Sequence, residues 1–174
     1  MKKIFLYTVL LISGLVFITS CEKDEIGGTA TEKMAGEWYV TVIAVDADGN
    51  TVYSDDELFG IGHFHLDTYN TSSNSMSELW VNDNGNFWDF KVKANIDLNA
   101  LTFQATDAQN EAYDSKVTIT NGKILYDAAT TPSGMPADSI VFNVNFNDDT
   151  YPADYGFDSY KVSGFRYTGF TGDE

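Results

Sequence analysis

Two histidines and an aspartate, each separated from the next by one apolar residue, are the side chains of this sequence best suited to chemistry. His63, His65 and Asp67 would point to one side of an extended strand, because successive side chains alternate between its two faces. Two imidazoles and a carboxylate can bind Zn²⁺ or Fe²⁺. The intervening Phe64 and Leu66 would face a core and leave the three polar side chains in solvent. A polar outer strand face is the simpler interpretation, and the three residues stay candidate metal ligands.

Catalysis by a serine would need a base and an orienting carboxylate within hydrogen-bond reach of its hydroxyl. Ser133 and Ser163 each precede a glycine, but neither lies in the Gly-x-Ser-x-Gly elbow of serine hydrolases. We interpret both as turn or strand residues and predict no catalytic residue.

Two segments with clustered Asp and Asn side chains, 46–50 and 82–86, partly match calcium-binding loops. In the first, the twelfth position would be Glu57, but the strand-like residues 51–53 intervene. Both segments are predicted to be tight turns between strands. No cofactor is predicted.

The composition indicates one folded, acidic domain. The chain has 174 residues, of which 43% are hydrophobic and 14% aromatic, so it can bury a sizeable core. Its net charge of −16 repels the phosphate groups of nucleic acids, which excludes nucleic-acid binding from the expected functions. The single cysteine, Cys21, excludes a disulfide within the chain.

Alternating apolar and polar residues predict antiparallel strands with one face on a core and the other in water. In the clearest example, Phe142, Val144 and Phe146 alternate with asparagines. Eight or nine strands are expected, near 37–45, 61–69, 77–82, 87–96, 101–106, 116–120, 123–128, 139–147 and 159–168.

Asn-Gly and Asp-Gly pairs separate several of these segments. Asp48-Gly49, Asn84-Gly85 and Asn121-Gly122 are predicted hairpin turns, because these residue types accept positive φ. Many short strands linked by hairpins predict an all-β fold: either a closed antiparallel barrel of eight or nine strands or a two-sheet β-sandwich.

The N-terminal segment has the pattern of a secretory signal. Two lysines precede an apolar stretch that is too short to span a membrane, and Cys21 stands where that stretch ends. This placement resembles the lipobox of bacterial lipoproteins, in which the cysteine carries the lipid anchor. We expect a signal peptide at 1–20, a flexible tether at 21–33 and a β-barrel domain at 34–174. The resemblance implies a lipid-anchored protein of the outer membrane, exposed at the cell surface or on the periplasmic face.

The first predicted strand opens with Gly36-Glu37-Trp38, and the only arginine of the chain, Arg166, falls in the last strand. This arrangement resembles lipocalin-like barrels, in which a tryptophan closes one end beneath an arginine. The resemblance favours the barrel over the sandwich and implies that Gly36, Trp38 and Arg166 close one end. A cation–π contact in such a place contributes about 1–2 kcal/mol.

The stretch from Gly28 to Val40, together with the lipoprotein-like start and the Tyr- and Asp-rich strands, resembles a Bacteroidetes family of surface lipoproteins known as lipid-binding putative hydrolases. The resemblance implies a lipocalin-like barrel that holds a lipid or another small hydrophobic ligand. No motif in the sequence supports the hydrolase part of the description.

Aromatic side chains are expected to line the ligand cavity of such a barrel. The predicted ligand-binding residues are Trp88, Phe90, Phe103, Phe142 and Phe146. Two alternatives stay open: a lipid-ester hydrolase that uses His63 or His65, and an accessory domain that binds glycans or a partner of an outer-membrane system through exposed aromatic residues.

Overall fold

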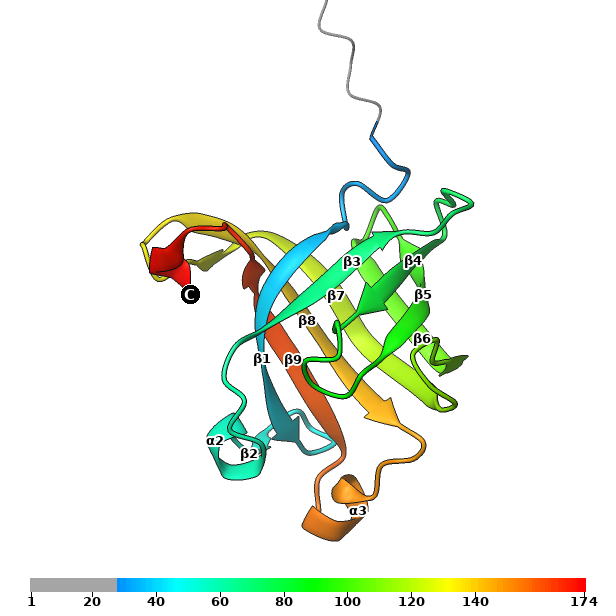
Figure 1. The fold of residues 1–174 in the computed structure, drawn as a ribbon, viewed down its shortest axis with the longest axis vertical. Coiled ribbons are helices and arrows are strands. Elements are labelled where there is room, and N and C mark those ends of the chain that lie inside the picture. Colours follow the sequence, from blue (N-terminus) through cyan, green and yellow to red (C-terminus); the bar gives the residue numbers. More distant parts are fainter. Residues whose placement is uncertain (1–27) are drawn as a thin grey trace, which may run out of the picture.

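The computed structural model describes residues 28–174, and Figure 1 shows their arrangement. The predicted signal peptide, the anchor residue Cys21 and the first half of the predicted tether lie outside the described residues. Within the described part, no helix has the length and apolar character needed to cross a membrane.

Within residues 28–174, nine strands form one antiparallel sheet that closes on itself. Strand β1 pairs with β3 on one edge and with β9 on the other, so β1 and β3 to β9 make a closed eight-stranded barrel with β2 as an added strand beside β1. The prediction of an all-β, lipocalin-like barrel is confirmed, and the sandwich alternative is wrong. The elements are β1 (Gly36–Val45), β2 (Thr51–Tyr53), α2 (Asp55–Leu58), β3 (Phe64–Asn70), β4 (Glu78–Asn82), β5 (Lys91–Asp97), β6 (Thr102–Gln109), β7 (Lys116–Thr130), β8 (Pro136–Phe146), α3 (Tyr151–Tyr155), β9 (Ser159–Arg166) and η2 (Thr171–Asp173).

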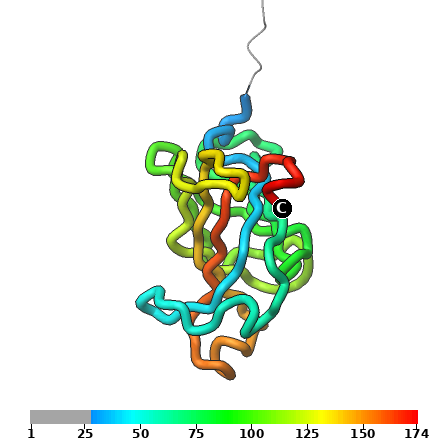
Figure 2. Tube along the Cα trace, turned by 90° about the vertical axis from the view of Figure 1, so that its left-hand side faces the viewer, coloured from blue at the N-terminus to red at the C-terminus, as the bar shows by residue number. Residues whose placement is uncertain are grey.

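The two ends of the barrel differ in the segments that cover them. One, here called the N-terminal end, carries residues 28–35, the β3–β4 connection (71–77), the β7–β8 connection (131–135) and the last residues of the chain (167–174). The opposite one, here called the aromatic end, carries four loops. Two of them contain the short helices α2 and α3, which lie in the lower part of Figures 1 and 2. These four loops are 54–63, 83–90, 110–115 and 147–158.

Alternation along the strands fills the barrel interior. In β1, Trp38, Val40, Val42 and Ala44 are completely buried, while the side chains between them face outward or toward neighbouring segments. Every strand of the barrel contributes inward-facing apolar residues in the same way. Burial of apolar surface, at roughly 25 cal/mol per Å², is therefore the main force that holds this disulfide-free domain together.

The prediction of a hairpin at Asn121-Gly122 is wrong. The expected strands 116–120 and 123–128 are one continuous strand, β7, and the pair forms a bulge between Thr120 and Lys123. Asn121 does adopt positive φ, at 56°, but Gly122 stays in the sheet. A Cβ on Gly122 would overlap the Phe103 ring, so the glycine is needed for close packing and not for a turn.

The expected strand 87–96 begins later than its alternation predicts. Strand β5 starts at Lys91, and Phe87 and Trp88 belong to the loop 83–90. The short elements β2, α2 and α3 were not expected, and β8 starts three residues earlier than predicted. The turns at 46–50 and 82–86 are present, with positive φ at Gly49, Asn84 and Gly85.

Candidate functional site

Arg166 covers Trp38 at the N-terminal end, in the arrangement that the lipocalin resemblance implies. The guanidinium carbon lies 4.5 Å from the centroid of the indole ring. Its Nη1 donates to the Ala35 carbonyl at 2.8 Å, and its Nε donates to Asp138 Oδ2 at 3.1 Å. A Cβ on Gly36 would overlap the guanidinium, which explains the glycine two residues before the tryptophan.

The other side of the indole is also fixed. Trp38 Nε1 donates to the Thr68 hydroxyl at 2.8 Å, and that hydroxyl donates to the Met34 carbonyl at 2.7 Å. Trp38, Thr68 and Met34 are all buried. This end of the barrel interior is thus occupied by side chains, and the polar groups of Trp38 and Thr68 are both hydrogen-bonded.

Aromatic residues from loops meet aromatic residues from strands at the aromatic end. Trp88 stacks on Phe146 with centroids 5.0 Å apart and an interplanar angle of 12°. Phe87 contacts Tyr160 edge to face at 5.2 Å. The loop residues of this aromatic cap are Phe59, Phe87, Trp88 and Tyr151. Beneath it lie Phe64, Phe146 and Tyr160 on strands, and Phe90, which directly precedes β5. The four residues beneath the cap are buried, whereas those of the cap are only partly covered.

The buried carboxylate of Asp83 shapes the loop that holds half of this cap. Its Oδ1 accepts hydrogen bonds from the backbone N–H groups of Gly85 and Phe90 at 3.0 and 2.8 Å. Its Oδ2 accepts from those of Phe87 and Trp88 at 3.1 and 2.8 Å. Four N–H groups around one carboxylate satisfy its charge without a cation and fix where both aromatic side chains begin.

Asn110 joins the next loop to this one. Its Oδ1 accepts from the backbone N–H groups of Lys91 and Ala112 at 3.0 and 3.1 Å. Its Nδ2 donates to the Asp89 carbonyl at 3.2 Å and to Ser115 Oγ at 3.1 Å. The loops 83–90 and 110–115 therefore form one hydrogen-bonded unit.

Two tyrosine–aspartate bonds connect this unit and the strands to the loop 147–158. Tyr113 donates its hydroxyl hydrogen bond to Asp148 Oδ2 at 2.8 Å, close to solvent. Tyr160, fully buried, donates to Asp149 Oδ2 at 2.7 Å. Burial, followed by the adjacent carboxylate, raises the pKa of Tyr160 far above its usual range, so its hydroxyl stays protonated and acts as a donor.

Four of the five predicted ligand-binding residues, Phe90, Phe103, Phe142 and Phe146, are buried in the core, and the partly covered Trp88 packs against it from the loop 83–90. Trp88, Phe90 and Phe146 belong to the aromatic end, with Phe90 and Phe146 centroids 5.5 Å apart. Phe103 and Phe142 contact each other at 5.5 Å further along the barrel. All five pack against other aromatic side chains of the chain.

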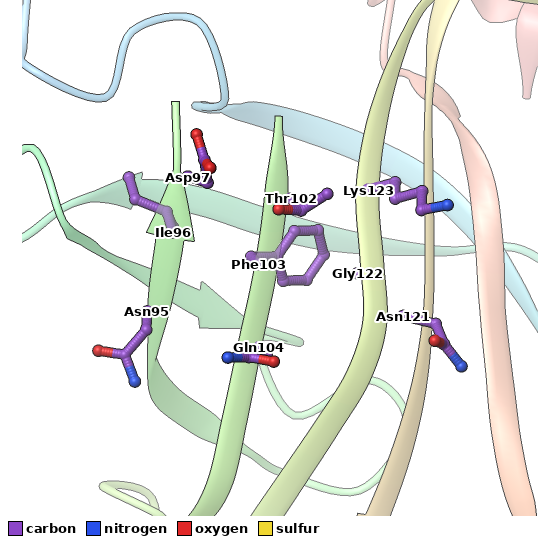
Figure 3. Close-up of a pocket in the computed structure, with 9 residues that line it drawn as sticks. All are labelled: Asn95, Ile96, Asp97, Thr102, Phe103, Gln104, Asn121, Gly122 and Lys123. Carbon is purple, nitrogen blue, oxygen red and sulfur yellow. The ribbon is translucent and has the colours of Figure 1, made fainter. Parts of the chain in front are cut away.

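The larger of two hollows described on the barrel wall has a volume of about 370 Å³ and opens on the outside of β5, β6 and β7 (Figure 3). It lies at the β7 bulge, where the Phe103 ring sits beside Gly122. Six of its nine lining residues are polar: Asn95, Asp97, Thr102, Gln104, Asn121 and Lys123, with Ile96, Phe103 and Gly122 completing it. The second, of about 260 Å³, lies beside Asp138 and Arg166. Both hollows are lined by polar as well as apolar surface, unlike the predominantly apolar pocket that a lipid needs.

Each of the three candidate metal ligands contacts another side chain on the outer barrel face, and both histidine rings contact Tyr39. His65 Nδ1 and Glu37 Oε1 are 2.8 Å apart, whereas the His63 ring stacks on Tyr39 at 4.8 Å. Asp67 instead accepts a hydrogen bond from an asparagine of the loop 83–90. No group of three or more His, Cys, Asp or Glu side chains placed to hold a metal ion occurs within residues 28–174.

Neither candidate serine is hydrogen-bonded to a histidine in the described part of the chain. Ser133 Oγ shares a hydrogen bond with Thr131 Oγ1 at 2.9 Å in the β7–β8 connection. Ser163 lies in β9, opposite Thr41 of β1. The His65–Glu37 pair therefore lacks a serine partner among these residues, and the geometry assembles no nucleophile–base pair.

The 46–50 segment uses its carboxylate within the turn. Asp46 Oδ1 accepts from the backbone N–H groups of Asp48 and Asn50 at 3.0 and 2.8 Å, and Oδ2 accepts from Asn50 Nδ2 at 2.9 Å. These bonds, those of Asn50 first, lower the pKa of Asp46. The acidic residue thus stabilises the β1–β2 hairpin.

A closed antiparallel barrel, filled by Trp38 under Arg166 at one end and capped by aromatic loops at the other, defines a lipocalin-like barrel protein. Residues 23–171 match the model of the family described as lipid-binding putative hydrolase. Because the match spans most of the chain, the protein belongs to this family. A search of curated proteins found no match.

Proposed function

We propose that this protein binds a lipid or another small apolar molecule at the aromatic end of its barrel, beneath the cap of Phe59, Phe87, Trp88 and Tyr151. The observation that carries the proposal is that two layers of aromatic side chains, the cap and the residues beneath it, come from different kinds of element. The cap is supplied by loops, whereas three of the four residues beneath it, Phe64, Phe146 and Tyr160, stand on strands of the closed barrel, and the fourth, Phe90, directly precedes β5. Loops move more readily than strands, so the interface between the layers is where an apolar guest can be admitted.

The driving force is burial. An acyl chain between the layers exchanges water for phenyl and indole surfaces, at roughly 25 cal/mol per Å² before the cost of association. Phe90 and Phe146 would contact the guest first, and Phe103 with Phe142 would mark the depth to which a long chain can reach. Trp38 and Arg166 would keep the other end closed. Family membership supports a lipid as the guest.

We also propose that the protein is anchored by a lipid at Cys21 after removal of residues 1–20. The anchor and the tether 21–33 would hold the barrel domain, 34–174, at the outer membrane, on the cell surface or the periplasmic face. The support is the sequence pattern of the first residues, and the described chain starts at the end of the barrel opposite the aromatic cap.

The binding proposal is tested with the full-length protein after lipid removal. Nile red, an uncharged dye that fluoresces in apolar surroundings, should bind saturably, quench Trp88 and be displaced by monoolein. The absence of saturable binding would refute the proposal.

A matched pair of variants locates the access route. Tyr113→Phe removes only the hydroxyl that bonds to Asp148, and Tyr126→Phe removes only the hydroxyl that donates to the Lys33 carbonyl at the N-terminal end. A net loss of about 1 kcal/mol from one hydrogen bond should speed dye uptake roughly fivefold in Tyr113→Phe. Tyr126→Phe should match the wild type. Faster uptake in Tyr126→Phe alone would place the route at the N-terminal end.

A further inference from the structure

The three most exposed large apolar side chains of the described residues all lie at the N-terminal end. Met76 is 70% exposed, Phe170 is 68% exposed and Met135 is 60% exposed. Met76 belongs to the β3–β4 connection, Met135 to the β7–β8 connection and Phe170 to the segment after β9. Figure 1 shows these three segments around the end of the barrel where the described chain begins.

Hydrogen bonds place the start of the chain between these segments. The Ala30 backbone N–H donates to Asn74 Oδ1 at 2.9 Å, in the same connection as Met76. Tyr126 lies in β7, the strand that leads to the connection with Met135. Its hydroxyl donates to the Lys33 carbonyl at 2.9 Å. The residues that precede Gly28 are therefore joined to the molecule at a point flanked by exposed apolar side chains.

Met135 and Phe170 are held in place as one unit. Asp173 Oδ1 accepts from the Ser133 backbone N–H at 2.8 Å, and its Oδ2 accepts from the Thr168 hydroxyl at 2.6 Å. The buried Asp173 thus fastens the C-terminal segment to the β7–β8 connection. The exposure of Met135 and Phe170 is therefore a fixed feature of the surface.

The connection with Met76 is ordered as well. The Ser75 and Ser77 hydroxyl groups share a hydrogen bond at 2.9 Å, and the Ser77 backbone N–H donates to Ser75 Oγ at 3.1 Å. Met76 lies between these two serines, at an ordered turn, and its side chain is exposed. All three apolar side chains therefore stand on hydrogen-bonded turns.

We propose that the N-terminal end of the barrel rests on a lipid surface, with Met76, Met135 and Phe170 inserted among the headgroups. The occupant is a membrane and not a protein groove, because the inference rests on the proposed anchor at Cys21, which joins the domain at this end. The net charge of −16 gives no electrostatic attraction to anionic lipids, so contact depends on apolar side chains of this kind. In this orientation the aromatic end faces away from the membrane, and ligand is exchanged with the aqueous side.

The test uses the full-length protein reconstituted in phosphatidylcholine vesicles. One cysteine is introduced by Met76→Cys, Met135→Cys or Phe170→Cys and labelled with the fluorophore NBD. The matched control is Tyr155→Cys, because Tyr155 is 50% exposed at the aromatic end. Unaltered protein, treated identically, measures any label on Cys21. Circular dichroism verifies that each variant is folded.

The three labels at the N-terminal end should shift to shorter emission wavelengths in vesicles and lose at least half of their intensity with brominated lipids. The label at position 155 should do neither. Protein that floats with the vesicles while all four labels stay unquenched, or while position 155 is quenched most, overturns the orientation alone. Protein that fails to float overturns both the anchor and the orientation. Nile red binding, measured without vesicles, reports separately on the ligand proposal.

Discussion

The backbone N–H of Trp88 donates to Asp83 Oδ2 at 2.8 Å, and this bond fixes the base of the side chain that stacks on Phe146. Asp83 is therefore a positioning residue for the aromatic cap. The carboxylate holds three further N–H groups of the same loop, so its effect extends over the whole of 83–90.

The substitution Asp83→Asn should destabilise the domain and loosen Trp88. An amide replaces one carboxylate oxygen with an NH₂ group, which leaves two backbone N–H groups facing a donor, at a cost of about 2–4 kcal/mol. Urea unfolding measures the loss, and acrylamide quenching measures the exposure of tryptophan. The control is Asp89→Asn in the same loop, where the side chain is exposed and asparagine tolerates the observed φ of 52°. Equal unfolding midpoints for both variants would argue against this role.

Arg166, which covers Trp38, and Gly36 should be energetically coupled. A double-mutant cycle of Arg166→Lys and Gly36→Ala measures this coupling. Arg166→Lys loses the planar stacking and the two-point hydrogen bonding, for which we expect a loss of about 1–3 kcal/mol in unfolding free energy. Gly36→Ala should cost a similar amount, because its Cβ displaces the same guanidinium. The double variant should then lose less than the sum. Strict additivity, or a loss equal to that of the exposed control Lys123→Arg, would contradict the coupling.

Residues with strict periodicity were predictable from the sequence, and this explains the success of the barrel prediction. Phe64 and Leu66 face inward and His65 and Asp67 outward, as the alternation requires. The Arg166–Trp38 contact could be anticipated because only one arginine exists and it falls in the last strand.

The aromatic end was less predictable, because its geometry depends on contacts that have no period. Trp88 continues the alternation of β5 in the sequence, but the four hydrogen bonds to Asp83 pull it into a loop. Asn121-Gly122 has the composition of a tight turn, and the barrel uses that conformational freedom for a bulge instead. The Asp-Asn-Gly turn at 83–85 was visible in the sequence, whereas its capture of Phe87 and Trp88 was not.

Acid should weaken the attachment of the C-terminal segment. Hydrogen bonds from Thr168 first and then Ser133 lower the pKa of Asp173 to about 2, below its usual value of 3.8. The unfolded chain therefore takes up a proton at this group before the folded protein does. Its stabilising contribution is complete above pH 4 and disappears as the pH falls toward 2.

Unfolding midpoints in urea at a series of pH values test this prediction. The difference between the wild type and Asp173→Asn should be largest near neutral pH and should shrink between pH 4 and pH 2. Asp127→Asn provides the comparison, since Asp127 is exposed on the same end and its φ of 50° suits asparagine. If the difference in midpoint between the wild type and Asp173→Asn is the same at pH 4 and pH 2, Asp173 does not contribute to the loss of stability in acid.

The charge of the loops around the aromatic cap should select uncharged lipids. The four loops 54–63, 83–90, 110–115 and 147–158 contain eleven acidic residues and neither lysine nor arginine. A fatty-acid carboxylate that approaches this rim is repelled, whereas a monoacylglycerol with the same chain is not. We expect at least about tenfold tighter binding of monoolein than of oleate in low salt, equal to roughly 1.4 kcal/mol.

Because salt screens charges over about 10 Å at 0.1 M, the preference for monoolein should shrink as salt is added. The double variant Asp55→Asn/Asp56→Asn should also reduce it, while Glu32→Gln/Asp127→Asn at the N-terminal end should not. Equal affinities for both lipids, independent of salt, would show that the ligand does not pass this rim.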